Sequence, residues 1–313
     1  MADALPLDMG MLNFYNVLSV ESPPEAATWP LDVQRAAWNR VCRKFRAAMP
    51  EGILVEDRYL AGVPCQIYRP EGEGIKPGLI YFHGGGWVLG GPDTHGDMCV
   101  EMARGADCVV VLVDYRLAPE NPHPAQLEDS LAVLIWLREH GEEIGINPAQ
   151  IIGGGDSAGG QMTAGLSLYL RNHKMTPLKA MLLIYPVLGA SVDTPSYIRN
   201  AEAPCLTRDE MIFFLDAFMG GQGTKNWSDP IAAPLLSKDL RDLPPAFITV
   251  AAHDPLFDDG VQFHERLSAQ GGASALRREP ELAHSYMRAR HVSAPAMAGF
   301  QAIIEALRHF TQT

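Results

Sequence analysis

Gly155-Asp156-Ser157-Ala158-Gly159 is the stretch that decides the fold, because it fits the pattern G-x-S-x-G. It directly follows a short apolar run at 151–152 and precedes a helical pattern over 157–172. A chain that reverses so sharply from strand to helix holds the serine in strained backbone geometry, and small flanking residues avoid collisions there. The N-terminus of the following helix also favours developing negative charge. The stretch therefore predicts a nucleophile elbow with Ser157 at its tip.

The same glycines also satisfy the loose dinucleotide-binding pattern G-x-G-x-x-A, over residues 153–158. That pattern expects an acidic residue roughly twenty positions later, at the end of the next strand, to bind a ribose. Here the next predicted strand ends in Ile184-Tyr185-Pro186, without a carboxylate. No Gly-Lys-Ser or Gly-Lys-Thr follows the glycines, which argues equally against a phosphate-binding P-loop.

Apolar runs without clear alternation lie on both sides of the elbow, and such runs are typical of strands covered on both faces. They lie at 78–82, 108–113, 151–152, 180–184 and 246–250, with a last strand near 273–278. Helical patterns occur at about 124–140, 157–172, 258–270 and 294–311. Because strands and helices alternate, the sequence predicts an α/β fold with a mostly parallel, doubly wound sheet.

The N-terminal region follows a different pattern. Apolar residues recur at near-helical spacing from 31 to 49, which predicts an amphipathic helix with Val33, Trp38, Val41, Phe45 and Met49 on one face. After Pro50, two short β-rich runs at 53–55 and 65–68 are separated by Ala61-Gly62-Val63-Pro64, and this predicts a hairpin-like start to the sheet.

Between Pro186 and Pro245 the strand rhythm stops. This segment shows no clear strand pattern but contains a strongly apolar helical stretch with Met211, Phe214, Leu215 and Phe218. An aromatic-rich helical insertion can pack, together with the N-terminal segment, as a cap over one end of the sheet. These four side chains can shape a substrate pocket there, but ordinary core packing explains them equally well.

His83-Gly84-Gly85-Gly86-Trp87 ends the strand predicted at 78–82. Three glycines leave backbone N–H groups uncovered, and fixed N–H donors stabilise the tetrahedral oxyanion of acyl transfer. An HGGG loop at this place is the oxyanion hole of lipases and esterases. The alternative is a plain glycine turn beside a core histidine.

An acid and a histidine should follow the nucleophile in that order. Asp254 comes directly after the strand predicted at 246–250, where a loop carboxylate can reach a histidine. Asp258 and Asp259 are weaker candidates, because they fall in the next helix and are expected to cap it.

Four histidines follow Asp254. His264 and His309 fall in predicted helices, whereas His284 lies in a loop after the last predicted strand. His284 is therefore the expected catalytic base, with His291 as the alternative.

The amino-acid composition limits the classes of molecule that the protein is expected to bind. The chain has 313 residues, 47% of them apolar, and a formal net charge of −12, which argues against nucleic acid as a partner. No run reaches the roughly 18 apolar residues of a membrane span, and the first residues do not read as a secretion signal. The five cysteines show no metal-ligand spacing, so we expect reduced thiols, no metal site and a cytoplasmic protein. They are Cys42, Cys65, Cys99, Cys108 and Cys205.

Together these motifs resemble the hormone-sensitive-lipase-like esterases, also called bacterial family IV carboxylesterases. The HGGGW box at 83–87, the GDSAGG elbow at 155–160 and the DPL acid loop at 254–256 all match that family. So does the DYRLAPE stretch at 114–120, and the likeness covers nearly the whole chain. One departure is visible, because the family's histidine is usually followed by Gly-Phe and here by Ser285-Tyr286.

The resemblance implies an α/β-hydrolase fold and a serine carboxylesterase acting on short-chain acyl esters. Ser157 would be the nucleophile, His284 the general base and acid, and Asp254 its orienting carboxylate. The oxyanion N–H groups would come from Gly85, Gly86 and Ala158.

The resemblance also implies a domain division. Residues 51–186 and 246–313 would form the catalytic domain, and residues 1–50 and 187–245 the helical cap. A small-molecule ester is the expected substrate, no cofactor is required, and a homodimer is expected because similar enzymes are often dimers. Two other functions stay open: an amidase or peptidase using the same triad, and a non-catalytic receptor that binds a small molecule under the cap.

Overall fold

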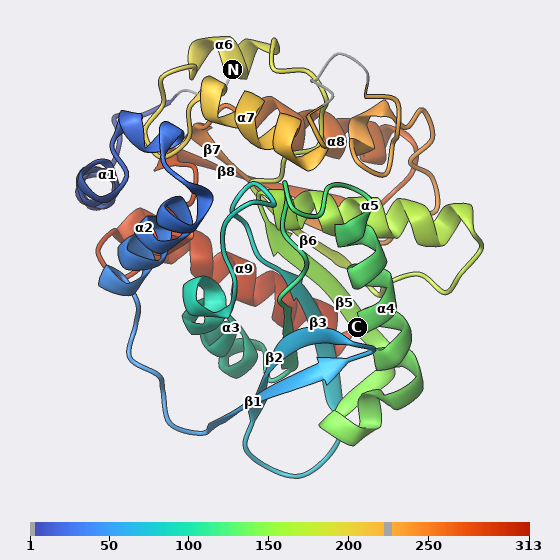
Figure 1. Ribbon diagram of the computed structural model, residues 1–313. Coiled ribbons are helices and arrows are strands. Elements are labelled where there is room, and N and C mark those ends of the chain that lie inside the picture. The colour runs from blue at the N-terminus through green and yellow to red at the C-terminus, as the bar shows by residue number, and fades with distance from the viewer. Residues whose placement is uncertain (1–3, 222–226) are drawn as a thin grey trace.

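The computed structural model describes residues 4–221 and 227–313, which surround an eight-stranded sheet (Figure 1). The strand order is β1-β2-β4-β3-β5-β6-β7-β8. β2 pairs antiparallel with β1 and β4, and all other pairs are parallel. The strands are β1 (Ile53–Leu60), β2 (Val63–Pro70), β3 (Lys76–Phe82), β4 (Val109–Val113), β5 (Ile146–Asp156), β6 (Met181–Ile184), β7 (Ala246–His253) and β8 (Ser274–Ala283).

Helices cover both faces of the sheet. On one face, α4 (Ala125–His140), α5 (Ala158–Asn172) and α8 (Phe257–Ala269) contact the strands. On the other face lie α3 (Pro92–Ala106) and α9 (Ala294–Gln312). The central strands are buried on both sides, which confirms the doubly wound α/β architecture expected from their continuous apolar runs.

The sequence located the eight strands and four of the five helices that cover the sheet, but it missed α3 and placed the ends of several elements less well. β5 is much longer than the apolar pair at 151–152, because the three glycines at 153–155 continue the strand up to the elbow. This position also excludes the dinucleotide-binding interpretation, since those glycines pair with β3 and β6 instead of forming a phosphate-binding turn. β8 likewise extends five residues beyond the predicted end near 278.

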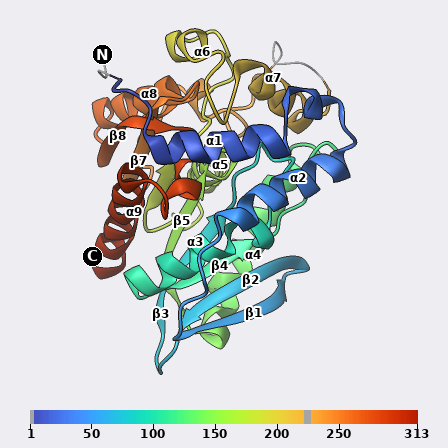
Figure 2. The ribbon, with the colours of Figure 1, turned by 90° about the vertical axis from the view of Figure 1, so that its left-hand side faces the viewer.

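The N-terminal prediction needs a correction. The predicted helix 31–49 is α2 (Leu31–Lys44), which ends five residues before the predicted end, with Phe45 as its C-cap. Val33 and Met49, assigned to the apolar face, are 39% and 45% exposed. A further helix, α1 (Met9–Glu21), is capped by the side chain of Asp8. It packs on α2, and Figure 2 shows the two side by side.

The segment between β6 and β7 contains α6 (Pro195–Arg199), α7 (Arg208–Phe218) and the 3-10 turn η4 (Pro234–Leu236) among its described residues. In Figure 1, α6 and α7 lie above the end of the sheet where the central strands finish. A capping box between Thr207 and Glu210 starts α7. Among the described residues, no helix is both long and apolar enough to cross a bilayer.

Candidate active site

The elbow predicted around Ser157 is present in the structure. β5 ends at Asp156, α5 begins at Ala158, and Ser157 between them has a φ of 55°. Such a left-handed conformation is strained for a side chain larger than glycine. The turn is possible because Gly159 lies against the backbone of β3, where a Cβ would come within 1.8 Å of the Phe82 carbonyl oxygen.

Ser157, His284 and Asp254 come together at the carboxyl end of the sheet, although they are far apart in the sequence. The Nε2 atom of His284 lies 3.0 Å from the Ser157 Oγ, and its Nδ1 atom lies 2.7 Å from the Asp254 Oδ2. All three residues are buried, with Asp254 fully enclosed. A proton can therefore pass from serine to histidine while a buried carboxylate orients the ring.

The Asp254 loop is held from both sides. The other carboxylate oxygen accepts the Leu256 N–H at 2.8 Å. Asn200, at the end of α6, donates from its side chain to the carbonyl oxygens of Ala252 and Asp254. The sequence analysis missed Asn200, because nothing in its local sequence indicates a contact with residues more than fifty positions away.

The weaker acid candidates have other partners. Asp259 accepts hydrogen bonds from the backbone N–H groups of Leu188 and Gly189, and Asp258 accepts one from Ser196. Both lie in the first turn of α8, but the expectation that they cap this helix was wrong, because their oxygens bind the chain after β6 instead. Burial raises the pKa of Asp259 to about 7.

The alternative histidines do not reach Ser157. His291 is on the surface, and its Nε2 atom lies 2.9 Å from a Glu101 carboxylate oxygen. His264 in α8 is bonded to Ser274, and His309 lies in the last turn of α9. Of the four histidines that follow Asp254, the structure places only His284 at the elbow.

The predicted oxyanion donors lie in two segments, Gly85 and Gly86 in the loop after β3 and Ala158 at the start of α5. Gly85, Gly86 and Ala158 are half-buried to fully buried, and no acceptor among the described residues takes their backbone N–H groups. Buried N–H groups without a partner are rare, because each one costs the desolvation of a polar group. Free donors of this kind can bind a developing negative charge, and Ala158 directly follows Ser157.

Asp156, the residue before the nucleophile, ties the oxyanion loop to the elbow. Its Oδ1 atom accepts the Tyr81 hydroxyl at 2.7 Å and the Gly84 N–H at 3.1 Å. His95 lies 3.3 Å from the same oxygen. Burial opposes the charge of Asp156, but His95, Tyr81 and Arg288 outweigh burial and lower the pKa of this carboxyl group.

His83 of the HGGGW box has a structural position. Its ring is fully buried and stacks on Tyr115 at 4.2 Å, and the Tyr115 hydroxyl donates to the His83 carbonyl oxygen at 2.7 Å. Burial lowers the pKa of His83 to about 3, so the ring is neutral at neutral pH. The DYRLAPE stretch therefore supports the oxyanion loop through Tyr115.

Helix α7 places two aromatic rings on this loop. The Phe214 ring packs so closely that a Cβ on Gly86 would come within 2.3 Å of it, and Phe218 stacks on Trp87 at 4.1 Å. Phe218 is fully buried, as are Met211 and Leu215, whereas Phe214 is partly exposed. Of the four apolar residues considered for the pocket, Phe214 is the one that touches the predicted oxyanion hole.

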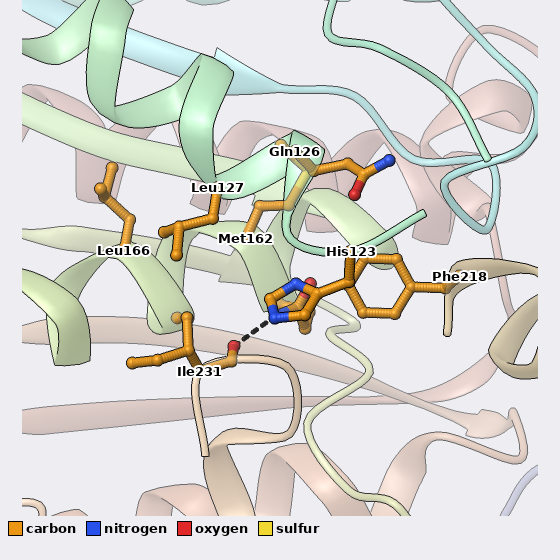
Figure 3. A pocket seen from close by; sticks show the side chains of 9 residues that line it. His123, Gln126, Leu127, Met162, Leu166, Phe218 and Ile231 are labelled. Atoms are coloured by element: carbon orange, nitrogen blue, oxygen red, sulfur yellow. Dashed lines mark hydrogen bonds between the residues drawn. The ribbon is translucent and has the colours of Figure 1, made fainter. Parts of the chain in front are cut away.

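A pocket of about 210 Å³, part of it open to solvent, lies one helical turn from the nucleophile (Figure 3). Ser157 does not line it. Its walls come from α4, α5, the end of α7 and the chain before η4, through His123, Gln126, Leu127, Gln161, Met162, Gly165, Leu166, Phe218 and Ile231.

Comparison with known proteins agrees with this geometry. The sequence profile of the alpha/beta hydrolase fold family matches residues 79–288. Carboxylesterase NlhH of Mycobacterium tuberculosis is 42% identical over 230 residues, which cover 73% of this chain and 72% of that protein. The chain belongs to the hormone-sensitive-lipase-like carboxylesterases.

Other members of this carboxylesterase family are similar over more of the chain. Ethyl acetate hydrolase of Pseudomonas putida is 31% identical, over 79% of this chain and 78% of that protein. The crystal structure of a thermostable esterase from Pseudomonas putida superposes with a TM-score of 0.92 at 28% identity, covering 98% of each chain. The chain is therefore a serine carboxylesterase with an α/β-hydrolase fold.

Proposed function

We propose that the chain hydrolyses esters through an acyl-enzyme formed on Ser157. The observation that carries this proposal is the His284 ring, which reaches the Ser157 Oγ with one nitrogen and Asp254 with the other. His284 takes the serine proton as the oxygen attacks the ester carbonyl carbon, and Asp254 stabilises the imidazolium that forms. The N–H groups of Gly85, Gly86 and Ala158 hold the tetrahedral oxyanion.

The same groups complete the acylation and then carry out the deacylation. His284 returns its proton to the leaving alcohol, which breaks the ester bond and leaves the acyl group on Ser157. Water then attacks this acyl-enzyme as His284 accepts its proton, and the carboxylic acid departs when the proton returns to Ser157. The cycle consumes one ester and one water and regenerates the enzyme.

We also propose that residues 1–50 and 187–245 form a cap that limits the acyl chain to a short length, with 51–186 and 246–313 as the catalytic domain. Two contacts support this division. Phe214 packs on Gly86, and Arg35 of α2 donates to the Val88 carbonyl oxygen at 2.9 Å. Both parts of the cap therefore touch the loop that carries the oxyanion donors.

The test is hydrolysis of p-nitrophenyl esters with two to sixteen acyl carbons by the wild type, Ser157→Ala and Ser167→Ala. Ser167 is a matched control, because it is a buried serine in α5, the helix that Ser157 precedes, and its hydroxyl donates to the Thr163 carbonyl oxygen. We expect wild-type activity on short chains, a loss of about 10⁴-fold or more in Ser157→Ala, and little change in Ser167→Ala.

Other results would redirect the proposal. Equal activity of wild type and Ser157→Ala would remove the serine from the mechanism. A folded wild type without activity on any ester of the series, but with activity on amide analogues, would favour an amidase. Preference for the longest chains would contradict a cap that restricts acyl length.

The homodimer and the cytoplasmic location stay predictions of the sequence. Light scattering on the purified chain tests the first, because a dimer doubles the mass of 34.2 kDa calculated for one chain.

A further inference from the structure

Trp87 has an unusual backbone conformation for a bulky residue. Its φ is 60°, in the left-handed region that a large side chain rarely adopts, and its side chain is fully buried. It directly follows Gly86, whose N–H group is one of the proposed oxyanion donors. Such conformations persist only when the surrounding structure fixes them, so the contacts of Trp87 decide how Gly86 is aimed.

Three contacts hold Trp87. Its indole N–H donates to the side-chain oxygen of Gln161 at 3.0 Å, and its ring stacks on Phe218. Its carbonyl oxygen accepts the Ala118 N–H at 2.8 Å. Of these three partners, Gln161 is the one that hydrogen-bonds the indole N–H. This bond therefore fixes the orientation of the Trp87 ring.

Gln161 connects three parts of the molecule. It lies on α5, where its backbone N–H donates to the Ser157 carbonyl oxygen at 3.2 Å. Gln161 is 3% exposed, and its side-chain amide also donates to the Ile231 carbonyl oxygen at 2.7 Å. Both ends of the amide are thus occupied, and the nucleophile helix, the oxyanion loop and the chain before η4 meet at one side chain.

We propose that Gln161 is a positioning residue for ester hydrolysis, which acts through Trp87 to aim the Gly86 N–H at the developing oxyanion. This inference rests on the proposed role of Gly86. A buried hydrogen bond with both partners fixed resists rotation, because breaking it leaves two polar atoms without water or protein partners. An N–H donor contributes to catalysis only where it points at the oxyanion of the transition state.

The test compares Gln161→Leu with Trp87→Phe. Leucine keeps the approximate volume of Gln161 and removes the hydrogen bonds to Trp87 and Ile231. Trp87→Phe keeps an aromatic ring to stack on Phe218 but removes the N–H. We expect each variant to lose about 10- to 100-fold in kcat on p-nitrophenyl acetate with KM within about threefold, since the ground-state carbonyl depends little on the oxyanion donors.

Two further measurements separate positioning from a general loss of structure. The double variant should lose no more than the worse single variant, because both substitutions break the same hydrogen bond. A trifluoromethyl ketone, whose adduct with Ser157 carries an oxyanion, should be bound more weakly by about the factor lost in kcat/KM.

Gln270→Leu is the control. Gln270, at the end of α8, also joins backbone groups through both ends of its amide, to Leu240 and Lys238, but at the opposite end of the sheet. Because Gln270 is only partly buried, we expect this variant to lower the melting temperature less than Gln161→Leu does, with kcat unchanged.

Two results would overturn the inference. One is a Gln161→Leu enzyme with wild-type kcat and wild-type ketone affinity. The other is a kcat loss in Gln161→Leu that Gln270→Leu reproduces, which would make the effect general destabilisation. Failure of the proposed function would give a different result. Ser157→Ala would then keep the wild-type activity, whereas failure of this inference alone leaves Ser157→Ala inactive.

Discussion

Two buried histidine–aspartate pairs lie beside Ser157, the proposed nucleophile, and only one of the two histidines contacts its hydroxyl. His284 and Asp254 lie 2.7 Å apart, and the second ring nitrogen of His284 faces Ser157. His95 and Asp156 lie 3.3 Å apart, and the second ring nitrogen of His95 is 2.7 Å from the Thr94 hydroxyl. Both pairs are therefore buried and in contact. They differ in the group beside the second ring nitrogen of the histidine, which is Ser157 for His284 and Thr94 for His95.

The two carboxylates also have different surroundings. Asp156 accepts hydrogen bonds from Tyr81 and Gly84, so it connects the elbow with the oxyanion loop. Asp254 binds the Leu256 N–H with one oxygen and devotes the other to His284. Under the proposed mechanism, the same residue pair serves as catalyst or as scaffold according to what lies beyond the histidine.

The sharpest way to break this comparison is to replace each histidine. His284→Ala should lower kcat by about 10⁴-fold or more, because no other group can accept the serine proton. His95→Gln, which keeps a donor toward Asp156, should cost about tenfold or less. Steady-state kinetics on p-nitrophenyl acetate measure both. Comparable losses in the two variants would mean that His95 takes part in proton transfer.

The carboxylates give the next largest contrast. Asp254→Asn should reduce kcat by about 10³- to 10⁴-fold, since an amide favours the wrong tautomer of His284. Asp156→Asn keeps an acceptor for Gly84 and Tyr81, so a loss of about 10-fold is expected, together with a lower melting temperature. A larger kcat loss in Asp156→Asn than in Asp254→Asn would reverse the proposed roles.

The sequence predicted the catalytic pair better than the scaffold pair. Ser157, Asp254 and His284 each follow a strand in a fixed order, and the carboxyl ends of parallel strands meet at one edge of the sheet. His95 has no such signal, because it lies inside α3 and its partner is 61 positions away. Gln161 was missed for the same reason, since its partners Trp87 and Ile231 are 74 and 70 positions away. Phe214 was named as a possible pocket residue, but its contact with Gly86 depends on how the segment 187–245 folds back on the sheet.

A smaller effect should appear in the pH dependence of stability. Burial lowers the pKa of both His83 and His95 in the folded protein, while the unfolded chain titrates near the usual value of about 6.5. As the pH falls below about 6.5, the unfolded state takes up protons that the folded state excludes, so the free energy of unfolding decreases. Above that pH neither histidine contributes a pH dependence.

His95→Gln tests this origin. We expect the fall in melting temperature between pH 7.5 and pH 5 to be about 2–4 °C smaller in this variant than in the wild type, because one buried neutral histidine is gone. Thermal unfolding followed by circular dichroism at both pH values measures the difference. Parallel pH curves for the two proteins would contradict the assignment to His95.

The smallest expected effect concerns an exposed ion pair, which should contribute less to stability than the buried histidine–aspartate pairs do. Arg35 binds Glu120 at 2.8 Å, but half of the Glu120 side chain is exposed to water. Arg35 is also anchored without it, through the carbonyl oxygens of Val88 and Ala118. Glu120→Gln should therefore cost only about 0–1 kcal/mol of stability and leave kcat unchanged, because solvent screens the pair. A fall in melting temperature of more than about 5 °C would show that this contact between α2 and the loop after β4 contributes as much as a buried pair.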